Sequence, residues 1–141
     1  MPRMTNFIYC LSAERMQAMD GKGDSINAMG VLAAMTPEFV PGTFSYSIVF
    51  SILDVDITQD NRIQIRFKDN NNKEIIDTGV LSIPRMPDAA DGVGLPKEYK
   101  GLNLSMDFRN VVFETEGLYT TEVYFNEELL SENPIYVKGK R

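Results

Sequence analysis

Two stretches of the chain alternate between apolar and polar residues. The first is Thr43–Asp54, in which five large apolar side chains occupy every second position: Phe44, Tyr46, Ile48, Phe50 and Ile52. In the second, Arg62–Lys68, Ile63, Ile65 and Phe67 alternate with Arg62, Gln64, Arg66 and Lys68. Successive side chains of a strand point to opposite faces, so a period of two predicts half-buried strands of an antiparallel sheet.

Four further segments are predicted to be strands because they are apolar and bounded by turn residues. They are Thr5–Ala13, Ile26–Met35, Glu74–Ile83 and Lys100–Phe108. The apolar stretch Val111–Phe113 leads into the last hairpin. Ile26–Met35 contains alanine and methionine, which favour a helix, but Gly30 and the neighbouring strands favour a buried strand. The loops between strands are expected at Glu14–Asp24, Thr36–Gly42, Asp69–Asn72 and Pro84–Gly94.

The segment Phe113–Val137 predicts a hairpin. Its first strand alternates from Leu118 to Phe125, a turn follows at Asn126–Glu128, and Pro134 is expected to break the return before a last strand, Ile135–Lys138. Gly117 precedes Tyr119 by two residues at the strand start. This spacing is typical of a tyrosine corner, in which the phenol donates to the backbone a few residues upstream; the alternative is an ordinary loop glycine beside a core tyrosine.

Strands that recur at short intervals with turn chemistry between them predict an all-β fold. We expect an antiparallel β-sandwich of Ig-like or C2-like topology with about seven to nine strands. The 141 residues fit a single domain, residues 1–141, which is long enough to bury a core without disulfides.

The composition excludes several common chemistries. The chain has no histidine and one cysteine, Cys10, so it lacks the residues for Ser-His-Asp or Cys-His catalysis, an internal disulfide or the usual zinc sites. We therefore predict no catalytic residues, no cofactor and no enzymatic activity. Cys10 lies inside an apolar strand and is expected to be a small buried side chain.

The formal net charge of −6 disfavours binding to nucleic acid or to anionic lipid, both of which need a positive surface. No stretch approaches the ~20 apolar residues of a membrane-spanning helix. The apolar run near the N-terminus is too short for the core of a signal peptide. These features predict a cytoplasmic protein.

One cluster of acidic residues is a candidate metal site. Asp54 and Asp56 follow a strand and point the same way, Asp60 comes next, and Asp69, Asp88 and Asp91 lie in other loops. Calcium takes six to eight oxygen ligands, which C2-type domains supply from loops at one end. The alternative is that these are ordinary solvated turns of an acidic protein.

The row Arg62, Arg66 and Lys68 is the one positive stripe of the sequence. A solvated sheet face explains it, and a surface for an acidic partner is the functional alternative. An exposed edge strand is a second way to recruit a protein partner.

The chain resembles a family of small, uncharacterised bacterial β-sandwich proteins, a domain of unknown function. The resemblance depends on the glycine-centred segment Ile26–Leu32, the proline-bearing connection Pro37–Pro41 and the closing strands, Gly117–Tyr119 and Leu129–Val137. It implies the sandwich fold and carries no assigned activity, so no site residue follows from it.

Two functions remain open at this point. The first is a protein-interaction or assembly module without enzymatic activity, whose unidentified protein partner includes the option of a second copy of the chain. The second is a domain that binds calcium or a small ligand through Asp54, Asp56 and Asp60.

Overall fold

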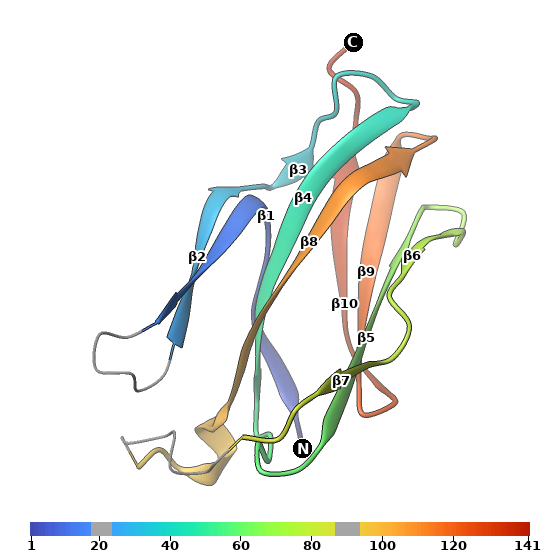
Figure 1. Ribbon diagram of the computed structural model, residues 1–141. Coiled ribbons are helices and arrows are strands. Elements are labelled where there is room, and N and C mark those ends of the chain that lie inside the picture. Colours follow the sequence, from blue (N-terminus) through green and yellow to red (C-terminus); the bar gives the residue numbers. More distant parts are fainter. Residues whose placement is uncertain (18–23, 87–93) are drawn as a thin grey trace.

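The computed structural model describes residues 1–17, 24–86 and 94–141, and these form an all-β protein (Figure 1). The described residues contain ten strands and one 3-10 turn, η2 (Lys97–Tyr99). The strands are β1 (Arg3–Gln17), β2 (Asp24–Val31), β3 (Ala34–Met35), β4 (Gly42–Leu53), β5 (Asn61–Lys68), β6 (Glu74–Asp77), β7 (Leu81–Ile83), β8 (Gly101–Phe113), β9 (Gly117–Phe125) and β10 (Glu128–Val137). Within this part of the chain, no helix is long and apolar enough to cross a membrane.

The strands form two sheets. The order in the four-stranded sheet is β2-β1-β4-β8, and each neighbouring pair is antiparallel. The other sheet has the order β3-β10-β9-β5-β6. Strand β7 pairs with the first residues of β5, and β6 pairs with its last residues. Its β3–β10 pair is parallel and covers two residues of each strand, while its other pairs are antiparallel. The expected antiparallel architecture is therefore present in nearly every strand pair described.

The core lies between the two sheets and is supplied by the alternating residues of β4 and β5. Tyr46, Ile48, Phe50 and Ile52 are almost fully buried, as are Ile63, Ile65 and Phe67. The rings of Tyr46 and Phe67, from opposite sheets, lie 5.6 Å apart. Aromatic rings at this separation contribute about 0.5–1.5 kcal/mol beyond the burial of their area. The predicted alternation of both strands is confirmed.

The predicted tyrosine corner is confirmed in its geometry. Gly117 begins β9 with φ 137°, and a Cβ there would lie 2.8 Å from the amide nitrogen of Asn70. Two residues on, the buried Tyr119 hydroxyl donates to the carbonyl of Thr115 at 2.7 Å. This bond fixes the direction in which the chain enters β9.

Strand β1 is longer than predicted and changes partner along its length. It pairs with β4 over Arg3–Cys10 and with β2 over Cys10–Gln17. The second half leaves β4 and forms a two-stranded ribbon with β2, visible beside the two sheets in Figure 1. From this ribbon, Arg15 donates to the backbone carbonyl of Asn103 on β8 at 3.1 Å.

Cys10 lies where β1 changes partner and is fully buried, as predicted. Its thiol donates to the Ser47 carbonyl at 3.7 Å, and burial raises its pKa. A thiol whose ionisation is disfavoured is a poor nucleophile, so this cysteine is a packing residue.

The prediction of one buried strand over Ile26–Met35 was wrong. The segment divides into β2 and β3, and only its end is core: Met35 is fully buried, whereas Met29 and Val31 are 44% and 66% exposed. The predicted strand Glu74–Ile83 also divides, into β6 and β7. These two divisions raise the number of described strands above the seven to nine expected.

Two predicted breaks, in contrast, are absent. Lys100–Phe108 and Val111–Phe113 belong to one strand, β8, in which three residue steps from Phe108 to Val111 oppose two steps of β4. This β-bulge absorbs the apparent interruption. Strand β10 continues through Pro134, which is opposite Thr120 of β9. Proline is tolerated there because β3 covers only the last two residues of β10, so the rest is an edge strand.

Candidate interaction surfaces

The three predicted metal ligands each contact a different donor of the protein. Asp54, with φ 62° just after β4, accepts from the ammonium group of Met1. Asp56 accepts from the Thr58 amide at 3.0 Å and from the Thr58 hydroxyl. These contacts stabilise the charged form and lower the pKa of both carboxyls, chiefly through the hydrogen bonds from Met1 and from Thr58.

Asp60 belongs to a separate ion pair. Its two oxygens accept from Nε and Nη2 of Arg85 at 3.2 and 3.0 Å, and this pair lowers the pKa of Asp60. Of the other acidic residues considered, Asp69 accepts from the backbone amides of Asn71 and Lys73, while Asp88 and Asp91 lie outside the described residues. Within the described ranges, no three carboxylates or thiolates group closely enough to hold a metal ion. The calcium site stays a prediction.

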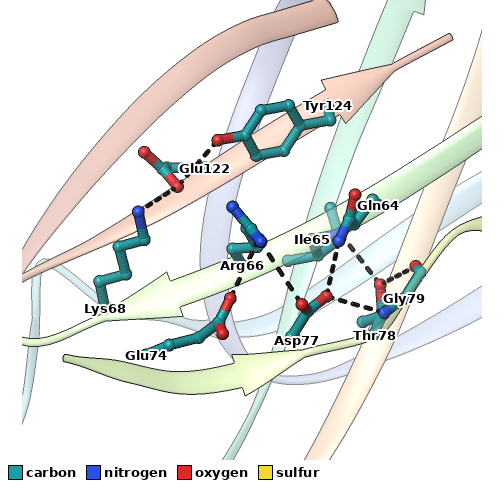
Figure 2. Close-up of polar contacts among 10 residues, drawn as sticks. All are labelled: Gln64, Ile65, Arg66, Lys68, Glu74, Asp77, Thr78, Gly79, Glu122 and Tyr124. Carbon is teal, nitrogen blue, oxygen red and sulfur yellow. Dashed lines mark hydrogen bonds and ion pairs between the residues drawn. The ribbon is translucent and has the colours of Figure 1, made fainter. Parts of the chain in front are cut away.

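The basic row of β5 is neutralised by acidic neighbours on the same face. Arg66 lies 3.0 Å from Glu74 and 3.6 Å from Asp77, and Lys68 lies 3.0 Å from Glu122. Figure 2 shows these side chains together on one side of β5. Arg62 pairs with Glu127 at 3.1 Å. Every cation of the row therefore has a carboxylate partner, which favours the interpretation of a solvated sheet face over a surface for an acidic partner.

Hydrogen bonds to β5 continue after β6 ends at Asp77. Thr78 follows β6, and its backbone amide donates to the carbonyl of Ile65 at 3.1 Å while its hydroxyl accepts from the Ile65 amide at 3.0 Å (Figure 2). Asp77 accepts from the Gln64 amide and from the Gly79 backbone, both at 2.8 Å, and the Gln64 bond is the main reason that its pKa is lowered. Side chains thus satisfy the backbone groups at this edge of the sheet.

A small hollow lies between β1 and β10. Its volume is about 260 Å³, and it is lined by residues 7–9, Val31, Leu32, Asn133 and Pro134. Among these lining residues, Tyr9 is buried, and its phenol contacts the Thr121 hydroxyl at 2.5 Å and donates to the Asn133 carbonyl at 2.6 Å. Small-molecule pockets usually measure about 300–1,000 Å³. This hollow suits a single side chain better than a drug-sized ligand.

The strand edges differ in how far they are protected. Natural sheets shield an edge by keeping it short, by placing proline or lysine on it, or by bulging it. Strands β3, β6 and β7 have two to four residues, and β10 carries Pro134 and two glutamates. Strand β8 has 13 residues with neither proline nor lysine, and among the described strands it pairs only with β4. Two features cover parts of this edge in the described structure: the bulge next to Arg109, and Arg15, which donates to the Asn103 carbonyl.

Arg109 is the functional candidate that the sequence pattern missed, because the predicted strand ended at Phe108. It is exposed, and within the described chain it makes no hydrogen bond or ion pair. The other six arginines contact an acidic side chain, a carbonyl or an aromatic ring. Asn110 could have indicated the bulge in the sequence, because asparagine tolerates a left-handed conformation, and its φ here is 54°.

One solved structure shares the fold of this chain but little of its sequence. A Pseudomonas fluorescens alkylpurine DNA glycosylase, AlkC, solved with DNA containing an abasic site analogue, aligns with a TM-score of 0.52 at 7% identity. A Listeria innocua β-glucosidase solved with isofagomine aligns with a TM-score of 0.44 at 8% identity. The alignments cover 97% and 95% of this chain but only 30% and 16% of those chains. At these identities the likeness to AlkC concerns the fold alone.

No curated protein matches the sequence. The model of one protein family matches residues 9–138, nearly the whole chain, and that family has no assigned function. The resemblance to a family of uncharacterised proteins is confirmed to that extent. The chain belongs to the family of unknown function DUF6941.

Proposed function

We propose that this protein is a non-enzymatic protein-interaction or assembly module whose binding surface is the free edge of β8. In this proposal an extended segment of the partner hydrogen-bonds to the outer backbone groups of β8 and adds a strand to the four-stranded sheet. Strand addition of this kind takes its affinity from main-chain hydrogen bonds and its specificity from alternate side chains.

The observation that carries the proposal is the length of the β8 edge with which no described strand pairs. The 13 residues of β8 pair with β4 on one side only, and the other described edge strands are shorter. A long edge without proline or lysine is a ready template for another strand. The lack of histidine and the paired state of the Tyr9 hydroxyl support a binding role over a catalytic one.

The proposal also includes four more specific expectations from the sequence. They are an Ig-like or C2-like sandwich topology, a bacterial origin, a cytoplasmic location, and partners that are proteins and not nucleic acid or membranes. The charge of −6 supports the last of these, because nucleic acid and anionic lipid both repel an acidic surface.

The test uses an edge-blocking variant. Leu104 lies half-buried in the middle of β8, and Leu104→Lys places an inward-pointing charge on the edge, a device by which natural sheets prevent strand addition. The long stem of lysine lets its ammonium group reach solvent, so the fold should survive, and circular dichroism and a thermal melt check this. Val31→Lys on the exposed part of β2 is the matched control.

Proteins captured from the native host by the wild-type chain are identified, purified and titrated against the wild type and the two variants by calorimetry. We expect a purified partner to bind the wild type and Val31→Lys equally and to bind Leu104→Lys at least about tenfold more weakly. Equal binding to the folded wild type and both folded variants would contradict the β8 edge as the binding surface.

A further inference from the structure

We propose that the partner on the β8 edge is a second copy of this chain, paired antiparallel to the first about a two-fold axis at Phe108. This inference rests on the proposed function and deepens it by naming the occupant. In the dimer the two four-stranded sheets meet edge to edge at the middle of β8, and the bulge after Arg109 limits the regular pairing to the residues around Phe108.

The charge pattern of β8 is self-complementary in this register. Asp107 and Arg109 flank Phe108, and both side chains are exposed. When two antiparallel copies align at Phe108, Asp107 of each copy lies directly opposite Arg109 of the other. Directly opposed residues in an antiparallel pair have Cβ atoms about 4.5–5.5 Å apart, and opposite charges there attract. The register forms two such pairs.

Both side chains are on the same face of the sheet, as this pairing requires. Asp107 is opposite Ser47, whose hydroxyl donates to its Oδ1, and Phe108 is opposite the core residue Tyr46. Val111 is the next buried position of β8, so the exposed Arg109 follows Phe108 on the outer face together with Asp107. The Ser47 hydrogen bond also holds the carboxylate in place.

Arg109 is the charge that this dimer would satisfy. It alone among the seven arginines has no partner within the described residues, although the protein has an excess of carboxylates. The bulge beside it leaves no unpaired amide at Asn110, since the Asn110 N–H donates to the Ser45 hydroxyl at 2.9 Å. The half-buried Phe108, whose ring lies 5.4 Å from that of Tyr46, would lose its remaining exposure against its own symmetry mate.

The neighbouring registers do not pair these charges. Alignment at Asp107 sets the two aspartates against each other, which is destabilising, and alignment at Met106 sets Asp107 against Ser105. Only the Phe108 register brings both aspartates opposite both arginines. Because one strand pair buries little area, we expect a weak dimer, with a dissociation constant of about 10–100 μM.

The experiment is a charge swap followed by sedimentation equilibrium over about 5–500 μM chain, a range that brackets the expected constant. Arg109→Asp and Asp107→Arg each replace two attractive pairs with two repulsive ones, and each should weaken self-association at least about tenfold. In a one-to-one mixture, the two variants again oppose unlike charges at all four positions. The mixture should therefore form heterodimers at wild-type strength.

The control variant is Arg62→Asp, which makes the same charge change on β5 and should dimerise as the wild type does. Thermal melts establish that every variant is folded. A wild type that stays monomeric throughout, or an Arg109→Asp variant that associates as strongly as the wild type, would overturn the proposal, as would a mixture that stays monomeric.

The outcomes separate this inference from the proposed function. If the wild type is monomeric but Leu104→Lys loses a purified partner, the second copy is the wrong occupant and the β8 edge remains the binding surface. If the chain dimerises, and neither the charge swap nor Leu104→Lys affects either dimer or partner, both proposals fail.

Discussion

The Tyr119 hydroxyl donates a hydrogen bond to the carbonyl oxygen of Thr115, four residues upstream, at 2.7 Å. The ring is fully buried and lies 5.4 Å from that of Phe67 on the neighbouring strand β5 of the same sheet. The corner therefore joins the loop before β9 to the core, and both the hydrogen bond and the ring contacts depend on one side chain.

Tyr119→Phe keeps the ring and removes the hydrogen bond. We expect the free energy of unfolding in urea to fall by about 1–2 kcal/mol, because the Thr115 carbonyl loses its donor in a partly buried place. Tyr136→Phe is the control, since Tyr136 is 52% exposed, and its effect should stay within about 0.5 kcal/mol. Equal stability of the two variants would contradict a structural role for the corner.

Tyr46 provides the opposite case. Its hydroxyl is buried and has no hydrogen-bond partner in the described structure, and burial raises its pKa well above the ordinary value. We expect Tyr46→Phe to leave the free energy of unfolding unchanged or to raise it by about 1 kcal/mol, because an unsatisfied buried hydroxyl is removed. Tyr9→Phe should instead lower it by about 1–2 kcal/mol, since the contacts with Thr121 and Asn133 are lost.

Urea titrations of both variants test this contrast. A Tyr46→Phe variant that is destabilised as much as Tyr9→Phe would show that the Tyr46 hydroxyl has a partner, such as a buried water, in solution.

Calcium is tested by a thermal melt with and without about 1 mM calcium, a concentration at which weak extracellular-type sites fill. Because Asp54, Asp56 and Asp60 already contact Met1, Thr58 and Arg85, we expect no change in the melting temperature. The control is the double variant Asp54→Asn/Asp56→Asn under both conditions. An upward shift in the wild type that disappears in this variant would establish the metal site instead, since a ligand that binds only the folded state stabilises it.

Asp56 gives a pH dependence whose direction follows from its contacts. The hydrogen bonds from Thr58 lower the pKa of Asp56 below the unfolded value of about 3.9. Its contribution to stability is therefore present above about pH 4 and is lost as the pH falls through the lower folded pKa. Between pH 5 and pH 3, the free energy of unfolding should fall less in Asp56→Asn than in the wild type. Urea titrations at both values check this, and an equal fall would contradict it.

The sequence predicted the elements whose signal is local. Strands β4 and β5 follow from alternation because one face of each packs on the core and the other meets solvent or a polar neighbour. The tyrosine corner likewise depends on residues four apart. Three of the four residues of β1 after Ala13 are polar, and the segment is extended because it pairs with β2. Such pairing is non-local, so the pattern placed a loop there.

The sequence did not predict the directions of the side chains in the candidate metal site. Asp54 and Asp56 stand two apart, which puts both on one side of a regular strand, but β4 ends at Leu53 and Asp54 has a positive φ. The Asp56 carboxylate accepts a hydrogen bond from the backbone amide of Thr58, two residues further along the chain. The importance of Arg109 also depends on facts absent from the sequence pattern: the bulge that carries β8 through Asn110, and the position of β8 at the edge of its sheet.

Hydrogen–deuterium exchange of β8 across a dilution series of the wild-type chain tests directly whether two copies pair along this strand. If β8 is the binding edge and a second copy occupies it, peptides covering residues 103–111 should exchange more slowly at about 200 μM than at about 2 μM, on either side of the expected constant. The exchange of β5, which lies inside its sheet, should not change with concentration. Exchange of β8 that is independent of concentration would contradict the self-pairing edge.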